Sequence, residues 1–421
     1  MLDINFIRDH ADQVKTAATN KNLDPAIVDQ VLTLDQKRRD LLTQAQAIRT
    51  QRNQLDDQLK KARQPDLIAQ SKTLKATLRQ LETDLKAVET DYQTAMHEVP
   101  NLPADDVPVG PDETGNQEVR TWGEKPKFTF TPQTHHQLAL TLDLYDSERA
   151  VRIAGNRAYF LKNELVALEQ AVLNFALKQM MAAGFTPMTV PWLVNRQALV
   201  GTGYFPWGEA DHYQTQDGQG LIGTAEVSLT AFHQGEVLSL ADLPVKLCGI
   251  SPCFRREVGS YGKDTQGFFR LHQFSKVEMV VLTEADETIT REWHEQMLTL
   301  SASVLEALGL PYRVLLMCTG DMGAGQRKKY DLETWFPGQN RYRETHSDSY
   351  FLDFQSRRLN IRYRDKAGQL KFVYTLNNTV AATPRLLAAI LENYQQADGS
   401  VLIPEVLKSY VGFDRIVNKS P

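Results

Sequence analysis

The chain has 421 residues, 42% hydrophobic and 24% charged, a composition typical of a globular protein with about two domains. Its formal net charge of −5 excludes a broadly basic surface, so any contact with nucleic acid must be confined to a local patch. Three cysteines form no even-numbered framework, and we find no export signal and no run of about 18 apolar residues. These features predict a cytoplasmic protein with reduced thiols and no membrane contact.

The first 109 residues contain neither glycine nor tryptophan, which separates them in composition from the rest. Their apolar residues follow the alternating spacing of four and three that marks a heptad seam. The first seam contains Ile27, Val31, Leu34, Leu41, Ala45, Ile48, Leu55 and Leu59, with Arg38 and Arg52 in two core positions. The second contains Leu74, Leu78, Leu81, Leu85, Val88, Tyr92, Ala95 and Val99. With the breaker Arg63-Gln64-Pro65-Asp66 between them, the seams predict an antiparallel two-helix coiled coil over about residues 26–99.

The distal half of this hairpin is basic, with eight basic and three acidic residues between positions 49 and 79, about +5 in all. The basic residues are Arg49, Arg52, Lys60, Lys61, Arg63, Lys72, Lys75 and Arg79. Each helix would be roughly 50 Å long, more than a compact domain needs, so we expect a projecting arm. Two interpretations stay open: a dimerisation coiled coil, which heptads commonly form, and an arm that binds a phosphate backbone.

Residues 99–117 carry four prolines and several acids, which predicts an extended linker. Beyond it, an amphipathic helix pattern at 163–184 is followed by β-rich runs at 309–320, 358–365 and 370–376. The second part is therefore expected to be an α+β domain with an antiparallel β-sheet flanked by helices. Neither GxxxxGK[ST] nor GxGxxG occurs, so a P-loop or dinucleotide-binding fold is not supported.

The most informative stretch joins two β-like runs through a glycine-bearing loop. Phe254-Arg255-Arg256-Glu257 ends the first run, the loop extends from Gly259 to Gly267, and RLHQF at 270–274 begins the second. A guanidinium at the base of such a loop suits a phosphate, and an aromatic ring suits stacking on a purine. Taken alone, these residues fit a salt-bridged surface hairpin equally well.

FRRE, a loop and RLHQF together resemble motif 2 of the class II aminoacyl-tRNA synthetases, and GSYGKDTQGFFRLHQFSKVEM is similar to the seryl enzymes. Gly184–Pro191 resembles motif 1 at the dimer interface, and ATPRLLAAILENYQ at 382–395 resembles motif 3. GTAEVSLTAFH, KKYDLETWFPGQNRYRE and DFQSRRLNIRYR resemble seryl-specific blocks. The resemblance implies a tRNA-binding domain at 1–105, a linker and start of the catalytic domain at 106–133, and a class II catalytic domain at 134–421.

The resemblance also implies an ATP site. In it, Arg255 would hold the α-phosphate, Glu257 would contact adenine, Phe274 would stack on adenine and Arg385 would reach the γ-phosphate side. The full implied set is Arg255, Arg256, Glu257, Arg270, Phe274, Glu344, Thr345, His346, Ser347 and Arg385. Glu344 and Ser347 would offer hard oxygen ligands to Mg²⁺ that accompanies ATP. An ion pair with Arg341 or Arg343 is the alternative for Glu344.

For the amino acid, the resemblance implies a serine site made of Thr224, Ala225, Glu226, Glu278 and Thr379. Carboxylates and a hydroxyl suit a small polar substrate with an ammonium group better than an apolar slot would. The alternation in SKVEMVVL leaves an alternative in which Glu278 lies on the solvent face of a strand. His272 is interpreted as a hydrogen-bonding, structural residue.

The chain also departs from the family pattern. Gly223 stands where proline is usual, and LNNT brings Asn378 and Thr379 in place of glycine and serine. The run after Glu344 is THSDSYFLDFQ, in which Asp348, Tyr350 and Phe351 are unexpected, and Thr383-Pro384 replaces glycines before Arg385. We expect a divergent but active enzyme.

The resemblance therefore implies a homodimer that activates L-serine with ATP and esterifies it to serine tRNA, and to selenocysteine tRNA where that tRNA exists. Two other functions remain as alternatives. One is a ligase that loads an activated amino acid onto a carrier protein, although such relatives lack the long arm. The other is a non-catalytic paralogue whose arm is a coiled-coil interaction module, for which broken motifs would be the sign.

Overall fold

The computed structural model describes residues 1–62, 64–260, 262, 264 and 267–418. These residues form two compact units, Met1–Pro100 and Asn101–Pro421, and each unit is described by itself.

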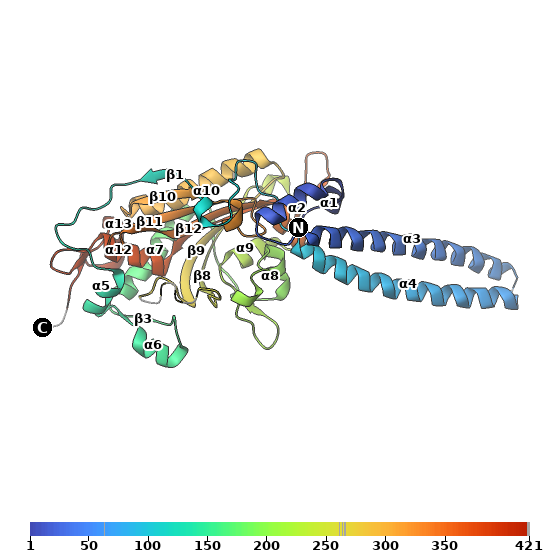
Figure 1. The fold of residues 1–421 in the computed structure, drawn as a ribbon, viewed down its shortest axis with the longest axis horizontal. Coiled ribbons are helices and arrows are strands. Elements are labelled where there is room, and N and C mark those ends of the chain that lie inside the picture. Colours follow the sequence, from blue (N-terminus) through green and yellow to red (C-terminus); the bar gives the residue numbers. More distant parts are fainter. Residues whose placement is uncertain (63, 261, 263, 265–266, 419–421) are drawn as a thin grey trace. The chain divides into compact units, whose positions relative to one another are not determined.

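The first unit is helical. It contains α1 (Ile4–Asp9), α2 (Ala11–Asn20), α3 (Ala26–Lys61) and α4 (Pro65–Glu98), and the last two lie side by side as a long hairpin (Figure 1). Pro65 occupies the first position of α4, where the N–H group that proline lacks would have no partner within the helix. The predicted hairpin over 26–99 is confirmed to within a residue at each end.

The seams that the heptads predict form the contact between α3 and α4. Every apolar residue assigned to the two seams is buried or half-buried. Arg38, in a core position, lies 5.5 Å from the centre of the Tyr92 ring and 3.5 Å from Glu89, so α4 supplies its partners. Asp35, which the heptad pattern does not mark, is fully buried and accepts two hydrogen bonds from Arg8, at 2.8 and 2.9 Å. This pair ties α1 to α3.

The second unit is built on an eight-stranded sheet. Its order is β1 (Gln117–Trp122), β10 (Tyr312–Leu316), β11 (Lys328–Phe336), β12 (Arg341–Leu352), β15 (Tyr374–Ala382), β9 (Gln273–Thr283), β8 (Val245–Phe254) and β4 (Thr186–Thr189). Neighbouring strands are antiparallel except for the edge strand β4, which is parallel to β8. The predicted antiparallel sheet is thus confirmed, with one parallel edge that motif 1 supplies.

Helices cover both faces of this sheet. The helices α7 (Glu164–Ala182), α10 (Glu287–Ala307) and α12 (Thr383–Asn393) pack on one face, and α9 (Glu226–Thr230) and α11 (Phe354–Leu359) contact β9 and β15 from the other (Figure 1). On β9, Val277, Met279 and Val281 join the core beneath α7 and α10, whereas Val280 and Leu282 join a second core with α8 (Arg196–Thr202) and α9. Alternation along β9 therefore turns Glu278 toward the second face, which is covered.

The remaining elements are short. They are α5 (His135–Thr141), β2 (Tyr145–Asp146), α6 (Ser147–Ala154), β3 (Phe160–Leu161), β5 (Leu193–Val194), β6 (Gly220–Leu221), β7 (Val237–Ser239), β13 (Arg362–Arg364), β14 (Leu370–Phe372), β16 (Val401–Leu402), α13 (Glu405–Val411) and β17 (Arg415–Ile416). Of the β-rich run at 358–365, only β13 is a strand, because the preceding residues continue α11. There Arg358 stacks 4.3 Å over the ring of Phe354, one helical turn away.

The segment predicted as a linker is extended but firmly held by the second unit. The side-chain amide of Asn101 donates to the carbonyl oxygens of Gly325 and Phe351, at 3.0 and 2.8 Å. Ala104 and Val107 are buried in the main core, and Asp106 pairs with Lys328 at 2.6 Å. From Asn101 onward, the segment predicted as an extended linker therefore packs as part of the second unit, where it buries both apolar and polar groups.

The three cysteines are free and buried, and burial raises the pKa of Cys248 to about 12. Among the helices described, none combines the length and apolar character that a membrane span requires.

Candidate active site

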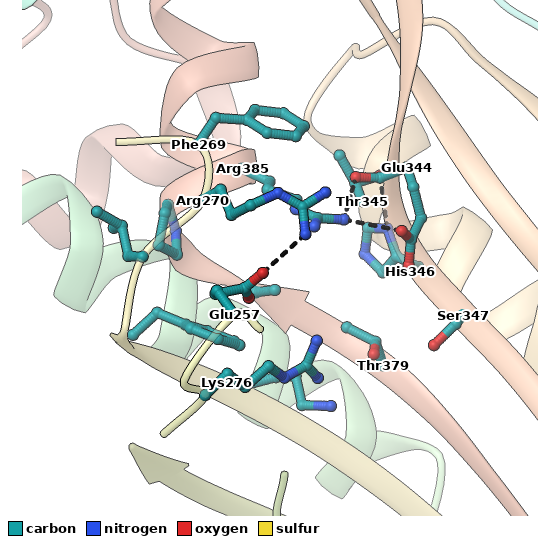
Figure 2. Close-up of a pocket in the computed structure, with 15 residues that line it drawn as sticks. Glu257, Phe269, Arg270, Lys276, Glu344, Thr345, His346, Ser347, Thr379 and Arg385 are labelled. Carbon is teal, nitrogen blue, oxygen red and sulfur yellow. Dashed lines mark hydrogen bonds and ion pairs between the residues drawn. The ribbon is translucent and has the colours of Figure 1, made fainter. Parts of the chain in front are cut away.

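A pocket lies beside β9, β12 and β15 and the start of α12, and it gathers residues from distant parts of the chain (Figure 2). Its lining comprises Arg255, Glu257, Phe269, Arg270, Leu271, Phe274, Lys276, Glu344, Thr345, His346, Ser347, Thr379, Ala382, Pro384 and Arg385. Every predicted ATP residue except Arg256 is in this lining. Arg256 is exposed and donates to the carbonyl oxygen of Ala210 at 3.0 Å, so the structure directs it elsewhere.

Arg255 stands where β8 ends. Its Nε donates to the carbonyl oxygen of Gly223 at 3.3 Å, and its guanidinium lies 5.4 Å from the centre of the Phe274 ring. His272 Nδ1 lies 2.9 Å from the carbonyl oxygen of Arg255, as expected of a structural histidine. A cation and an aromatic ring therefore stand beside one another in the pocket, an arrangement suited to a phosphate and a base.

Glu257 and Arg270 face each other across the neck of the glycine-bearing loop. Arg270 Nη1 donates to Glu257 Oε2 at 2.8 Å, and both side chains are mostly buried (Figure 2). The salt-bridged hairpin that the residues alone allowed does form. Both residues lie in the pocket lining, so the ion pair fixes the positions of pocket side chains and is not a surface contact.

Glu344 pairs with Arg385, not with the neighbouring arginines on its own strand. Arg385 Nη1 lies 3.0 Å from Glu344 Oε2 and donates to the Glu344 carbonyl oxygen at 2.8 Å. Arg343 instead contacts Asp264 at 2.7 Å. Desolvation opposes ionisation of Glu344, but the charges of Arg385 and Lys329 outweigh it and hold the pKa of Glu344 below its usual range. The pocket therefore contains a carboxylate that stays ionised.

A β-bulge brings Glu344 and Ser347 to the same pocket. On β12, His346 pairs with Leu332 and Glu344 with Glu333, which leaves Thr345 as the extra residue. Strict alternation would turn residues three apart to opposite faces, whereas here both Glu344 and Ser347 line the pocket. One carboxylate and one hydroxyl suit Mg²⁺ that takes its other ligands from phosphates and water. Within the described residues, no cluster of three or more His, Cys, Asp or Glu could hold a metal by itself.

The residues predicted for the amino acid lie together and are buried. Thr224 and Ala225 lead into α9, which begins at Glu226, while Glu278 on β9 is opposite Thr379 on β15. Thr379 Oγ1 donates to Glu278 Oε2 at 3.4 Å. Glu278 has no exposed surface, so the alternative that placed it on a solvent face is wrong.

Four residues that the sequence analysis did not assign hold these carboxylates in position. Tyr204 donates to Glu226 Oε2 at 2.6 Å, and Lys276 forms an ion pair with Glu278. Gln355 and Asn377 also donate to the carboxylates. Lys276 and Asn377 could have been found, because each lies two residues from a predicted site residue on the same strand. Gln355 lies in the block DFQSRRLNIRYR that resembles the seryl enzymes, and that resemblance could have found it. Tyr204 comes from a segment with no such signal.

The environment of Glu226 disfavours its charge. Desolvation and the nearby charge of Glu278 raise the pKa of Glu226 to about 7, although hydrogen bonds from Tyr204 and Gln355 act in the opposite direction. Lys276 balances only one of the two carboxylates. An ammonium group beside Glu226 and Glu278 would supply the second positive charge.

Two departures from the family pattern turn out to be neighbours. Asp348 on β12 is opposite Asn378 on β15, and both are fully buried on the α10 side of the sheet.

Thr383, which stands in place of a glycine, accepts from the Ser275 amide at 3.3 Å and donates to the Ser275 carbonyl oxygen at 3.0 Å. Thr383 thereby ties the start of α12, and Arg385 with it, to β9.

In the helical unit, the predicted basic residues lie along the distal part of the hairpin. Arg49 pairs with Glu82 at 2.9 Å across the two helices, Lys60 pairs with Asp57 at 2.8 Å, and Arg52 lies 4.0 Å from Asp56. Lys61, Lys72, Lys75 and Arg79 are exposed, and the described part of the chain gives them no ion pair. Arg63 lies outside the described residues.

Two family models match the chain. Residues 1–103 match the seryl-tRNA synthetase N-terminal domain, and residues 211–394 match the tRNA synthetase class II core domain (G, H, P, S and T).

Full-length relatives agree with these matches. The serine–tRNA ligase of Deinococcus radiodurans is 43% identical over 416 residues, 98% of either chain. That of Treponema denticola is 40% identical over 424 residues, 99% of this chain and all of the relative. Among solved structures, the seryl-tRNA synthetase from Pyrococcus horikoshii complexed with ATP superposes with a TM-score of 0.93, at 37% identity and complete coverage of both chains.

Proposed function

The chain belongs to the seryl-tRNA synthetase family, and on that premise we propose that it activates L-serine with ATP and transfers the seryl group to serine tRNA. One observation carries the proposal: a single pocket contains Arg255, Glu257, Phe274, Glu344 and Arg385, with the buried carboxylates of Glu226 and Glu278 close by. These are the charged and aromatic groups that ATP and a small amino acid need.

Adenylate formation is the in-line attack of the serine carboxylate on the α-phosphate of ATP, with pyrophosphate as the leaving group. Negative charge grows on the phosphoryl oxygens, so positioned guanidinium groups stabilise the transition state. In our proposal Arg255 meets the α-phosphate and Arg385 the γ-phosphate side, while Glu257 and Phe274 hold adenine. Arg270, Thr345 and His346 complete the ATP site. No covalent intermediate with the protein is needed.

We assign Glu344 and Ser347 as the protein ligands of Mg²⁺ that binds with ATP. The ionised state of Glu344 and the shared orientation created by the bulge at Thr345 support this assignment. When bound, the metal would neutralise phosphate charge and hold the triphosphate in one conformation.

For the amino acid, we propose that Glu226 and Thr224 receive the ammonium group and that Glu278 and Thr379 receive the hydroxyl. Alanine and glycine keep the ammonium group but lack the hydroxyl, so they would leave the buried carboxylate of Glu278 without its substrate partner, which disfavours both. Ala225 keeps the wall of the site small.

We further propose that residues 1–105 form a tRNA-binding domain, that 106–133 lead into the catalytic domain, and that 134–421 form that domain. The arm would contact the long variable arm of the tRNA through shape and backbone charge. Its contacts would be Arg49, Arg52, Lys60, Lys61, Arg63, Lys72, Lys75 and Arg79. The family resemblance supports a homodimer in which one subunit's arm serves the other's active site. We place the reaction in the cytoplasm with its tRNA substrate, and we include selenocysteine tRNA where it exists.

The test is ATP–pyrophosphate exchange driven by each amino acid in turn, followed by tRNA charging with and without residues 40–85. We expect exchange with serine, and charging that needs the arm. Serine-dependent exchange with transfer to a carrier protein but not to tRNA would favour the carrier-protein ligase. No exchange with any amino acid would favour the non-catalytic paralogue. Arg255→Ala should abolish exchange without loss of the fold.

A further inference from the structure

The serine site assigned above does not account for the buried amides that surround its carboxylates. We propose that Gln355 and Asn377 are positioning residues of the amino-acid site, which hold the carboxylates of Glu226 and Glu278 at the orientation and spacing that the substrate requires. The inference rests on the proposed function, because it concerns how that site binds serine.

Gln355 comes from α11, within the DFQSRRLNIRYR block to which the proposed function gives no role. Its side chain is 1% exposed, and its Nε2 donates to Glu226 Oε1 at 2.8 Å and to the Thr202 carbonyl oxygen at 2.9 Å. Its Oε1 accepts from Thr375 Oγ1 at 2.5 Å. Because the Thr202 carbonyl oxygen and the Glu226 carboxylate are acceptors, Nε2 must face them, and the amide has one satisfactory orientation.

Asn377 connects the two carboxylates directly. Its Nδ2 lies 3.0 Å from Glu226 Oε2 and 3.0 Å from Glu278 Oε1, so one amide group donates to both. Thr375, Asn377 and Thr379 alternate along β15 and all contact the site or its supports. Asn377 thereby sets the separation of two groups that would otherwise repel each other.

The charge balance explains why neutral amides serve here. The titratable groups around Glu226 are Tyr204, Glu278, Lys276 and, near Tyr204, Arg255. Two carboxylates therefore share one lysine, and a substrate ammonium group would supply the missing charge. A lysine or arginine at position 355 would neutralise Glu226 and compete with the substrate. An amide stabilises the ionised carboxylate while leaving its charge for the ligand.

Gln355→Glu tests this role in the full-length enzyme, since it keeps the shape and makes the donor titratable. Above neutral pH the new carboxylate would repel Glu226, whereas at lower pH its protonated form could still donate. We expect the KM for serine at pH 8 to rise roughly tenfold or more, as loss of a charge-assisted hydrogen bond implies. For the wild type we expect the KM for serine to fall as pH rises through the pKa of Glu226, and in the variant this dependence should weaken or reverse. The KM for ATP should stay within about twofold.

Gln197→Glu on α8 is the matched control, because this exposed side chain donates only a long 3.3 Å bond to the Arg358 carbonyl oxygen. Its pH profile should follow the wild type. Gln355→Met and Asn377→Leu remove the donors without adding charge, and they serve if Gln355→Glu fails to fold. Both variants should raise the KM for serine, and the midpoint of its pH dependence should shift to higher pH.

The outcomes are distinct. Wild-type enzyme without serine-dependent exchange would overturn the proposed function and this inference with it. Wild-type exchange together with variants whose serine KM and pH profile match the wild type would overturn this inference alone. Equal increases in the KM for serine and ATP, with a lowered melting temperature, would also overturn it, because they indicate a packing role only.

Discussion

Glu226 shows how the site balances burial against binding. Its carboxylate has no solvent to stabilise its charge, so Tyr204, Gln355 and Asn377 supply hydrogen bonds instead. The same burial raises the pKa of Glu226 to about 7, inside the physiological range. The residue that we propose as the partner of the substrate ammonium group is therefore also sensitive to pH.

We predict that serine binding weakens as pH falls. Below about pH 7 Glu226 becomes protonated in the free enzyme, so the KM for serine should rise by about tenfold per pH unit, while the KM for ATP changes little. Exchange kinetics between pH 6 and 8.5 would measure both constants. A serine KM that stays flat over this range would contradict the assignment of Glu226 to the ammonium group.

Asp348 is a second buried carboxyl group, and the proposed reaction gives it no role. It is fully buried, and within the described residues neither carboxylate oxygen has a hydrogen-bond partner. His294 Nε2 lies 3.6 Å away, but burial lowers the pKa of His294 to about 3, so this histidine is neutral. Burial, with the charges of Glu295 and Glu278, raises the pKa of Asp348 well above its usual value.

A carboxyl group with a raised pKa stabilises the folded state only at low pH, and that contribution is lost as pH rises through the folded-state value. Asp348→Asn keeps the shape and removes the titration. We therefore expect the variant to melt at a higher temperature than the wild type, with a larger difference at pH 8 than at pH 5. Calorimetry at both pH values would measure it, and an equal or lower melting temperature at pH 8 would be the contrary result.

At the scale of the element, the hairpin of α3 and α4 combines a seam that holds it together with a charged exterior. The seam buries its apolar residues against the facing helix, and Arg49 with Glu82 bridges the helices at 2.9 Å. Lys61, Lys72, Lys75 and Arg79 are exposed and outside the ion pairs of the described chain. Removing their charges should leave the hairpin intact, because they take no part in the seam.

Replacing these four residues with alanine should weaken tRNA binding and make it less sensitive to salt. Each lost phosphate contact lowers the slope of log K against log salt by about 0.7 to 0.9. The KM for tRNA should rise, and serine-dependent exchange should not change. Lys37→Ala with Lys86→Ala, nearer the base of the hairpin, is the control. If the slope of log K against log salt does not change, the four charges do not contact tRNA and serve solubility instead.

At the scale of the whole molecule, the catalytic unit exposes apolar side chains near the motif 1 strand. Trp192 and Leu193, in the segment that follows β4, are 50% and 45% exposed, and β4 itself forms one edge of the large sheet. An uncovered edge strand beside large apolar side chains is unfavourable in water. Burial against a second copy of the chain would remove both costs.

We therefore predict that Trp192→Glu shifts the enzyme from dimer to monomer in sedimentation velocity and lowers exchange activity. A charge buried in the interface would cost more than the subunit contact supplies. Leu370→Glu, at a comparably exposed position on β14, should leave the sedimentation unchanged. A wild-type monomer, or a Trp192→Glu dimer, would argue against this interface.

The sequence by itself determined the parts that depend on neighbours along the chain. Heptad spacing predicted both helices of the hairpin, and the breaker that contains Pro65 predicted the break between them. The family resemblance implied the residues of an ATP site, and all of them except Arg256 line one pocket. The hairpin prediction is confirmed because periodicity records which face of a helix is buried.

Only the tertiary structure decided which elements cover each face of a helix or strand. Alternation alone allowed Glu278 to face solvent. The helices α9 and α11 cover that side of the sheet, and Glu278 is therefore buried. The partner of Glu344, the bulge at Thr345 and the donors Tyr204 and Gln355 were likewise settled by contacts between segments far apart in sequence. Local patterns cannot encode such contacts, because their strength depends on the packing of other elements.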